Sequence, residues 1–144
     1  MTSSVSIVSC KNYDPAFVYA ALHQAVALLG GIDNFIKPAS KVLLKPNLLM
    51  TAEPEKGITT HPEVVRATIR LLKEINCKII VGDSPSVWGN QLKQYDELCQ
   101  RTGMKKVCQE ESVELVDFNK RRWRGKFPLT TWLDDCDFLV NLPK

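Results

Sequence analysis

The sequence has 144 residues, of which 44% are hydrophobic and 24% charged, and its formal net charge is +3 at pH 7. This length suffices for one domain that buries roughly 70% of the surface exposed by its unfolded chain. The composition excludes a disordered or collagen-like chain, and the small net charge gives no general attraction to nucleic acid or membranes. We therefore expect a single globular domain over residues 1–144, or the N-terminal part of a longer one.

The start of the chain and its cysteines predict a cytoplasmic protein. Residues 1–12 lack the basic start and the apolar stretch of a signal peptide, and the most apolar segment, 17–29, is too short to cross a bilayer of roughly 30 Å. The five cysteines form no Cys-x-x-Cys pair, which favours reduced thiols in a core. We expect no membrane contact and no metal or cofactor in this chain, and the sequence indicates no oligomeric state.

The first predicted elements are a strand over Val5–Cys10 and a helix that starts at Asp14. The strand is rich in β-branched residues. The Asp14 carboxylate can accept a backbone N–H of the first helical turn, and Pro15 loses no hydrogen bond there. Apolar residues recur at helical spacing over residues 18–29, and Gly30 supplies a left-handed stop.

A second strand and the clearest helix come next. The strand Lys41–Asn47 is apolar at its centre and ends beside a proline, which cannot donate to a sheet ladder. Thr60 and Glu63 have the spacing of a capping box. Apolar residues over 64–75 then line one face of a helix that Asn76 can close.

The rest of the chain continues to alternate strands and helices. A third strand begins one residue after that helix, which predicts a right-handed parallel crossover between the second and third strands. The later elements are the third strand Cys77–Asp83, a helix through Leu92, Tyr95, Leu98 and Cys99 that ends near Gly103, strands Val113–Phe118 and Asp137–Leu142, and a basic hairpin or ribbon over 120–132. This order predicts an α/β fold with an open, mostly parallel sheet and helices on both faces.

Polar residues gather where the predicted strands end. Ligands of open parallel sheets bind outside the carboxyl ends of the strands, and a helix start offers unpaired N–H groups and a dipole that favour an anion. We therefore predict a site for a small anionic ligand there. The catalytic candidates are Lys45, His61 and Asp83, and the ligand-binding candidates are Asn47, Thr59, Thr60, Ser84, Asn141 and Lys144.

The residue types suggest particular roles, and each also has a purely structural reading. His61 can transfer protons near neutral pH, Asp83 can accept a hydrogen bond or coordinate a cation, and Ser84 can donate to an oxyanion. Lys45 is equally well read as a solvated strand end, Thr60 as a helix cap, and the segment after the third strand as a turn. Both readings stay open at this point.

Several familiar signatures are absent from the sequence. It contains no dinucleotide-binding or phosphate-binding glycine motif, no zinc-hydrolase motif and no serine-hydrolase motif. The basic segment 120–126 could bind phosphate, with Trp123 as a stacking platform. We instead favour a solvated, charged loop that discourages edge-to-edge sheet pairing. We do not expect nucleic acid as a partner.

Four segments taken together resemble the family known as domain of unknown function 362. They are Val42–Asn47, Thr59–Arg66, Val81–Pro85 and Val140–Lys144. The resemblance implies a bacterial or archaeal protein of about twice this length, whose members often carry a ferredoxin-like segment with two 4Fe–4S clusters beyond this region. This chain has no such cysteine motif. Relatives continue past Lys144 into a further lysine, threonine and histidine, so we expect part of any active site to lie beyond this region.

Three readings of the function follow. The first is the N-terminal part of an iron–sulfur-associated, redox-linked enzyme that binds a small anion at its strand ends. The second is a non-catalytic binding or scaffold module that uses segment 120–126 for nucleic acid or protein. The third is a distant similarity to lactate racemases with a nickel-pincer cofactor, in which His61 is the one residue that matches. The sequence indicates neither the substrate nor the reaction.

Overall fold

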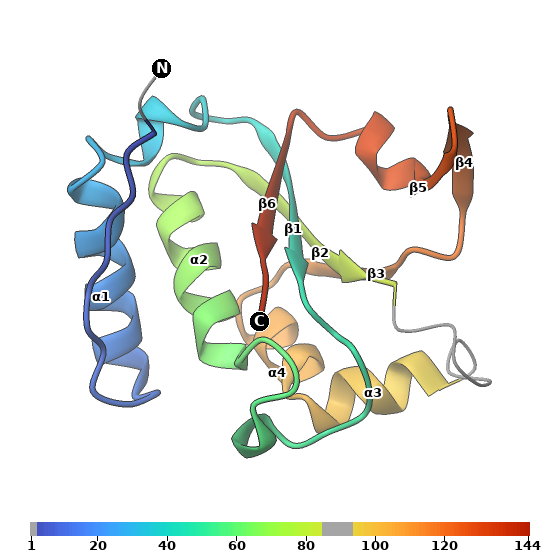
Figure 1. Ribbon diagram of the computed structural model, residues 1–144, viewed down its shortest axis with the longest axis horizontal. Coiled ribbons are helices and arrows are strands. Elements are labelled where there is room, and N and C mark those ends of the chain that lie inside the picture. Colours follow the sequence, from blue (N-terminus) through green and yellow to red (C-terminus); the bar gives the residue numbers. More distant parts are fainter. Residues whose placement is uncertain (1–2, 85–93) are drawn as a thin grey trace.

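β1, one of the two interior strands of the sheet, has a parallel neighbour on each side. A computed structural model describes residues 3–84 and 94–144, in which the four-stranded sheet has the order β3-β2-β1-β6 (Figure 1). Its main elements are α1 Pro15–Ala27, β1 Lys41–Pro46, α2 Pro62–Glu74, β2 Lys78–Asp83, α3 Tyr95–Arg101, α4 Met104–Glu110, β3 Glu114–Asp117 and β6 Phe138–Leu142. The strands β4 Arg121–Arg124 and β5 Phe127–Thr130 form a separate antiparallel hairpin.

The predicted parallel pairing of the second and third strands is confirmed. β1 and β2 pair in parallel from Lys41 opposite Lys78 to Leu44 opposite Val81. β6 pairs in parallel with the other side of β1, and β3 pairs in parallel with the outer side of β2. The centre of β1 is therefore fully buried, as expected for a strand enclosed by neighbours on both sides and layers on both faces.

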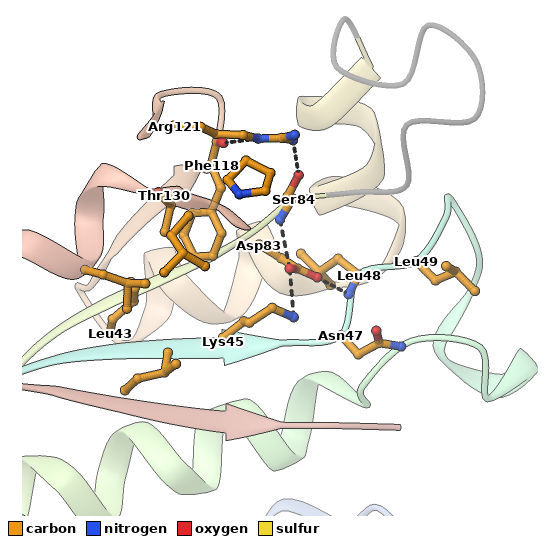
Figure 2. A pocket seen from close by; sticks show the side chains of 14 residues that line it. Leu43, Lys45, Asn47, Leu48, Leu49, Asp83, Ser84, Phe118, Arg121 and Thr130 are labelled. Atoms are coloured by element: carbon orange, nitrogen blue, oxygen red, sulfur yellow. Dashed lines mark hydrogen bonds and ion pairs between the residues drawn. The ribbon is translucent and has the colours of Figure 1, made fainter. Parts of the chain in front are cut away.

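The two faces of the sheet have different covers, and the predicted open, parallel α/β sheet is confirmed. The first face packs against α2, α3 and α4, and α1 packs in turn against α2. The second face carries Leu43 and Phe118 (Figure 2). It is covered by the 3-10 helix η4, Thr131–Asp134, through Trp132 and Leu133. The predicted basic hairpin is also confirmed, as β4 and β5.

The first helix begins as predicted, but the strand predicted before it is wrong. The Asp14 carboxylate accepts the N–H of Ala16 at 2.9 Å, and Pro15 is the first helical residue. Val5–Cys10 instead runs as an extended segment with no ladder partner within residues 3–84 and 94–144. β-branched residues favour a pleated, half-buried surface, but strand formation also requires a neighbouring strand, which this segment lacks among the described residues.

The helix predicted to end near Gly103 is in fact followed by another. Leu92 lies outside the described residues, and α3 begins at Tyr95. Gly103 adopts a left-handed conformation with φ of 78°, which breaks the helix, and α4 then starts at Met104. Gly103 was expected to end the helical region, so α4 was not predicted.

The start of α2 is capped by His61, so the predicted capping box of Thr60 and Glu63 is wrong. The N–H of Glu63 donates to His61 Nδ1 at 3.2 Å, and the imidazole stacks on the Tyr13 ring at 3.7 Å between centroids. Burial lowers the pKa of His61 below its ordinary value of 6.5, and the nearby charge of Lys144 acts in the same direction. A neutral imidazole suits this position, because a cap must accept a hydrogen bond.

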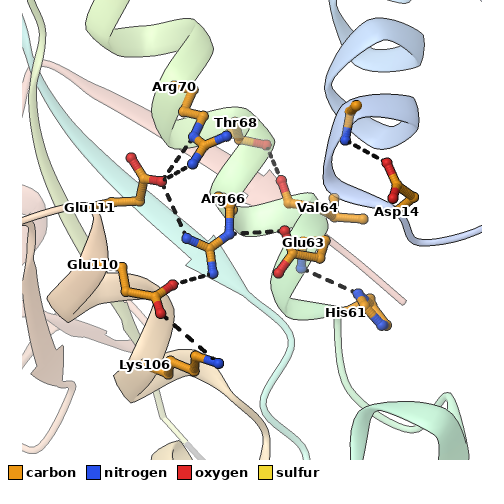
Figure 3. A network of polar contacts seen from close by, with 11 residues as sticks. Asp14, His61, Glu63, Val64, Arg66, Thr68, Arg70, Lys106, Glu110 and Glu111 are labelled. Atoms are coloured by element: carbon orange, nitrogen blue, oxygen red, sulfur yellow. Dashed lines mark hydrogen bonds and ion pairs between the residues drawn. The ribbon is translucent and has the colours of Figure 1, made fainter.

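An ion-pair network joins α2 to α4 (Figure 3). Arg66 donates to Glu63 at 2.9 Å, to Glu110 at 2.6 Å and to Glu111 at 3.3 Å. Glu111 also accepts from Arg70 at 2.8 Å. Burial by itself raises the pKa of Glu111, but the hydrogen bonds from arginine and lysine outweigh it and hold that pKa below its ordinary value. The carboxylate of Glu111 is therefore the anionic centre of this network.

We predict that the His61→Asn variant loses less stability than the parent when the pH falls from 7.5 to 5.5. The folded-state pKa of His61 is depressed, so its stabilising contribution is complete above about pH 6.5 and is lost as the pH falls toward the folded-state pKa. Asparagine retains a capping acceptor but does not titrate. Urea unfolding at the two pH values measures the effect. His23→Asn on α1 is the control, and the prediction is wrong if it flattens the pH dependence equally.

We also predict that Glu111→Gln lowers the free energy of unfolding by about 1–3 kcal/mol at pH 7, because buried Arg66 loses a charged partner. Glu110→Gln is the matched control. Its carboxylate is far more exposed, so we expect a loss of under about 1 kcal/mol. Urea unfolding of both variants provides the measurement, and equal losses would contradict the central position of Glu111.

Candidate functional site

A cavity of about 530 Å³ opens on the second face of the sheet, at the carboxyl ends of β1 and β2. The β4–β5 hairpin and η4 form its other side (Figure 2). Its polar lining residues are Lys45, Asn47, Asp83, Ser84, Arg121 and Thr130, and its apolar ones are Leu43, Leu48, Leu49, Phe118, Pro128, Leu129, Leu133 and Leu139. The volume lies within the range of roughly 300–1,000 Å³ typical of small-molecule sites.

Asp83 is the most constrained polar residue of this cavity. Its carboxylate lies 2.9 Å from the Lys45 ammonium and accepts backbone N–H groups from Leu48 at 2.7 Å and from Ser84 at 2.8 Å. Asp83 is buried, and a buried carboxylate requires such partners. The bond to Leu48 also ties the loop after β1 to the end of β2.

Arg121 extends this polar row from the hairpin. Its guanidinium donates to Ser84 Oγ at 2.6 Å and to the Phe118 carbonyl at 3.2 Å. In Figure 2, Lys45, Asp83, Ser84 and Arg121 form a continuous row of contacts along one wall of the cavity. Among the described residues, two cations and one carboxylate give the charged lining a net charge of +1.

Gly82 allows the apolar wall of the cavity to lie close to the sheet. A Cβ atom at this position would meet Phe118, Val116 Cγ2 and the Val116 carbonyl, each at 2.7 Å. No real Cβ approaches other atoms so closely, so only glycine fits beneath the ring without displacement. The Phe118 side chain is thereby held against β2 while it also lines the cavity.

A second group of predicted residues lies at the start of α2. Thr60 Oγ1 accepts the N–H of Asn47 at 2.8 Å and donates to the Leu142 carbonyl at 2.7 Å, so it joins the loop after β1 to the end of β6. Beside it, His61 caps α2, and the positive charge of nearby Lys144 helps to lower the pKa of its imidazole. Among the described residues, the buried hydroxyl of Thr59 has no hydrogen-bond partner.

The structure therefore divides the predicted site residues. Four of them line the cavity: Lys45, Asn47, Asp83 and Ser84. Four others, Thr59, Thr60, His61 and Lys144, do not line it. Asn141 lies opposite Lys45 in the β1–β6 register, but it is exposed and does not line the cavity either.

Sequence reasoning did not assign Arg121, Phe118 or Thr130 to the site. Arg121 belongs to the basic segment 120–126, and the positive charge of that segment was the one sequence signal that pointed to anion binding by this residue. Its placement over Ser84 depends on the hairpin turning back over the second face of the sheet, and no local pattern encodes that path. Pro85, in the predicted turn, lies outside the described residues.

Within residues 3–84 and 94–144, no group of three or more His, Cys, Asp or Glu side chains is arranged to hold a metal ion. Over the same residues, no helix combines the length and the apolar character needed to cross a membrane.

Comparison with known proteins places the chain in a family. Its residues 42–144 match the family model described as "Domain of unknown function (DUF362)". The chain is also similar to the thylakoid-associated protein sll1697 of Synechocystis sp. (strain ATCC 27184 / PCC 6803 / Kazusa), with 32% identity over 150 residues. That match covers 100% of this chain but 45% of the relative, so the chain spans less than half of the relative's length. No solved structure matches. The chain belongs to the DUF362 family.

Proposed function

We propose that the chain binds a small monoanion with an apolar body, such as a hydrophobic carboxylate, in the cavity on the second face of the sheet. The observation that carries this proposal is the Lys45 ammonium, which stands at the cavity wall beside a carboxylate whose other contacts are backbone N–H groups. Asp83 thus orients Lys45, and the net charge of the lining still favours one added negative charge.

The two cations retain hydrogen-bonding capacity for a ligand. An ammonium has three donors, and that of Lys45 contacts Asp83 and, at 3.4 Å, the Pro46 carbonyl. Its side chain is 33% exposed, so a ligand oxygen can reach it. The guanidinium of Arg121 has five donors and uses Nε and Nη2 in the contacts described above. A carboxylate can accept from both groups.

The apolar lining favours a hydrophobic body over a bare inorganic anion. The cavity has more apolar than polar lining residues, including Leu43 and Phe118 on the sheet and Leu133 on η4. Burial of ligand carbon against them would supply about 25 cal/mol per Å². At the start of α2, by contrast, the N–H groups of Glu63 and Val64 are already used by His61. We therefore place the anion in the cavity.

Catalysis and redox chemistry are separate from this binding proposal. His61 does not line the cavity, so proton transfer by this residue requires a ligand that extends toward α2. The link to iron–sulfur electron transfer and the similarity to lactate racemases rest on resemblance. The predicted cytoplasmic location also stays a prediction, and the relative's name associates that protein with thylakoids.

The basic hairpin is a second candidate, as a surface for a protein partner. Trp123 and Phe127 are exposed there. Arg122 and Arg124 both pair with Asp134, and these pairs lower the pKa of that carboxyl group. These two cations share one carboxylate, which lowers the net positive charge of this surface without cancelling it. The exposed aromatic side chains therefore suit a protein partner better than nucleic acid.

We predict that phenylacetate binds the parent chain and that Lys45→Met weakens this binding about tenfold or more, equivalent to about 1.4 kcal/mol. The loss of one charge-assisted contact is the physical reason. Isothermal titration calorimetry measures the affinity. Lys78→Met, at the opposite end of the neighbouring strand, is the matched control and should bind as the parent does. Phenylacetamide, which has the same body but no charge, should bind weakly to all three proteins.

Arg121→Met is a second test in case Lys45→Met unfolds the chain. Arg121 is exposed, so its replacement should leave the fold intact. We expect it to weaken phenylacetate binding as well. The proposal is wrong if both variants retain the parent affinity, or if phenylacetamide binds the parent as tightly as phenylacetate does.

A further inference from the structure

The topology of the chain implies a position for the extended segment 5–10 in the sheet. This segment leads through α1 into β1, and α1 packs against α2. Crossovers between parallel strands are right-handed in about 98% of cases. Since β1 leads through α2 to β2 on one side, a crossover through α1 beside α2 requires segment 5–10 to lie on the opposite side of β1. β6 occupies the position next to β1 on that side, so segment 5–10 belongs beyond β6.

Segment 5–10 has the character of a strand without a partner. Ser6 and Val8 are half-buried, whereas Val5 and Ile7 are 81% and 90% exposed. This alternation is that of a β-strand with one covered face. Figure 1 shows the segment running alongside α1. It has no ladder partner in the described part of the chain.

An apolar groove separates this segment from the helices. It has a volume of about 380 Å³ and is lined by Ile7 and Val8 of the segment, Val18, Leu22 and Ala25 of α1, and Val64 of α2. α1 is mostly apolar, in the sequence Pro-Ala-Phe-Val-Tyr-Ala-Ala-Leu-His-Gln-Ala-Val-Ala, yet Val18 is its one buried residue. A helix with apolar residues around its circumference is usually buried, so further structure should cover this one.

The outer edge of the sheet, at β6, is also unfinished. β6 pairs with β1, and no second neighbour of β6 is present among the described residues. Its residues alternate between half-buried and exposed, and Leu139 is 48% exposed. Strands of parallel sheets are normally buried on both faces, and an apolar edge is a template for another strand.

We propose that a further β-strand inserts between β6 and segment 5–10, pairs with both, and covers α1 from the sheet side. The occupant is a strand from the part of a longer family chain that lies outside these 144 residues. The relative in Synechocystis has more than half of its length outside the matched region, which leaves ample chain to supply it. A second copy fits less well, because pairing two β6 edges would leave both 5–10 segments without a partner. This proposal is independent of the cavity ligand.

Hydrogen–deuterium exchange followed by mass spectrometry tests the insertion. The probe is the unmatched remainder of the Synechocystis relative, produced as a separate polypeptide and mixed with the 144-residue chain. In the chain alone, the amides of residues 5–10 should exchange at the rate of an unstructured peptide. In the mixture, exchange should slow at least tenfold both in residues 5–10 and in β6.

Proline variants provide the matched control. The double variant Ile7→Pro/Val8→Pro removes two consecutive N–H groups, which point to opposite sides of the strand, and should abolish the protection. Ser3→Pro/Ser4→Pro lies ahead of the pairing segment and should retain it. Both should melt at the parent temperature in the isolated chain, where the segment carries no ladder. Unchanged exchange of either segment in the mixture overturns the proposal. A dimer of the chain alone with both segments already protected also overturns it, because a second copy would then be the occupant.

Discussion

Parallel pairing on both sides of β1 is the constraint on which the rest of the structure depends. Because β1, β2 and β6 run in the same direction, their carboxyl ends meet at one edge of the sheet. Lys45, Asp83 and Leu142, which are far apart in the sequence, are thereby brought to the same end of three adjacent strands. The crossovers that parallel pairing requires place α2, α3 and α4 on one face and leave the other to η4 and the hairpin. The cavity lies on this second, less covered face.

Two hydrogen-bonded centres hold the loops at that edge, and both include a backbone partner from the loop after β1. The carboxylate of Asp83 holds Leu48, and the hydroxyl of Thr60 holds Asn47 together with Leu142. Each brings a buried polar group into contact with a backbone group that would otherwise lack a partner, so removal of the side chain would leave the backbone unsatisfied. Asp83 and Thr60, which the sequence predicts as site residues, therefore also have structural roles.

The predictions from sequence succeeded where local pattern and tertiary packing agree. The apolar strand β1, the Asp14 cap of α1 and the basic hairpin were all predicted. Val5–Cys10 was predicted as a strand from its β-branched residues. Strand formation also requires a neighbouring strand, and the residue composition of a segment does not indicate whether one is present. The capping box was wrong because Thr60 is used by Asn47 and Leu142, and those contacts span 13 and 82 positions. For the same reason Arg121 was not assigned to the site, since its proximity to Ser84 arises from the path of a distant hairpin.

The glycine beneath Phe118 has a consequence for which molecules the cavity can admit. Gly82 does not line the cavity, yet it sets how deeply the aromatic ring sits on the sheet and thus where the floor lies. Even a single methyl group at this position would meet the ring, the Val116 side chain and the Val116 carbonyl, so the ring and the neighbouring strand would both have to move. Under the proposed binding function, a larger residue here would change the shape of the cavity without altering any charge, and selectivity would depend on a residue that the ligand does not touch.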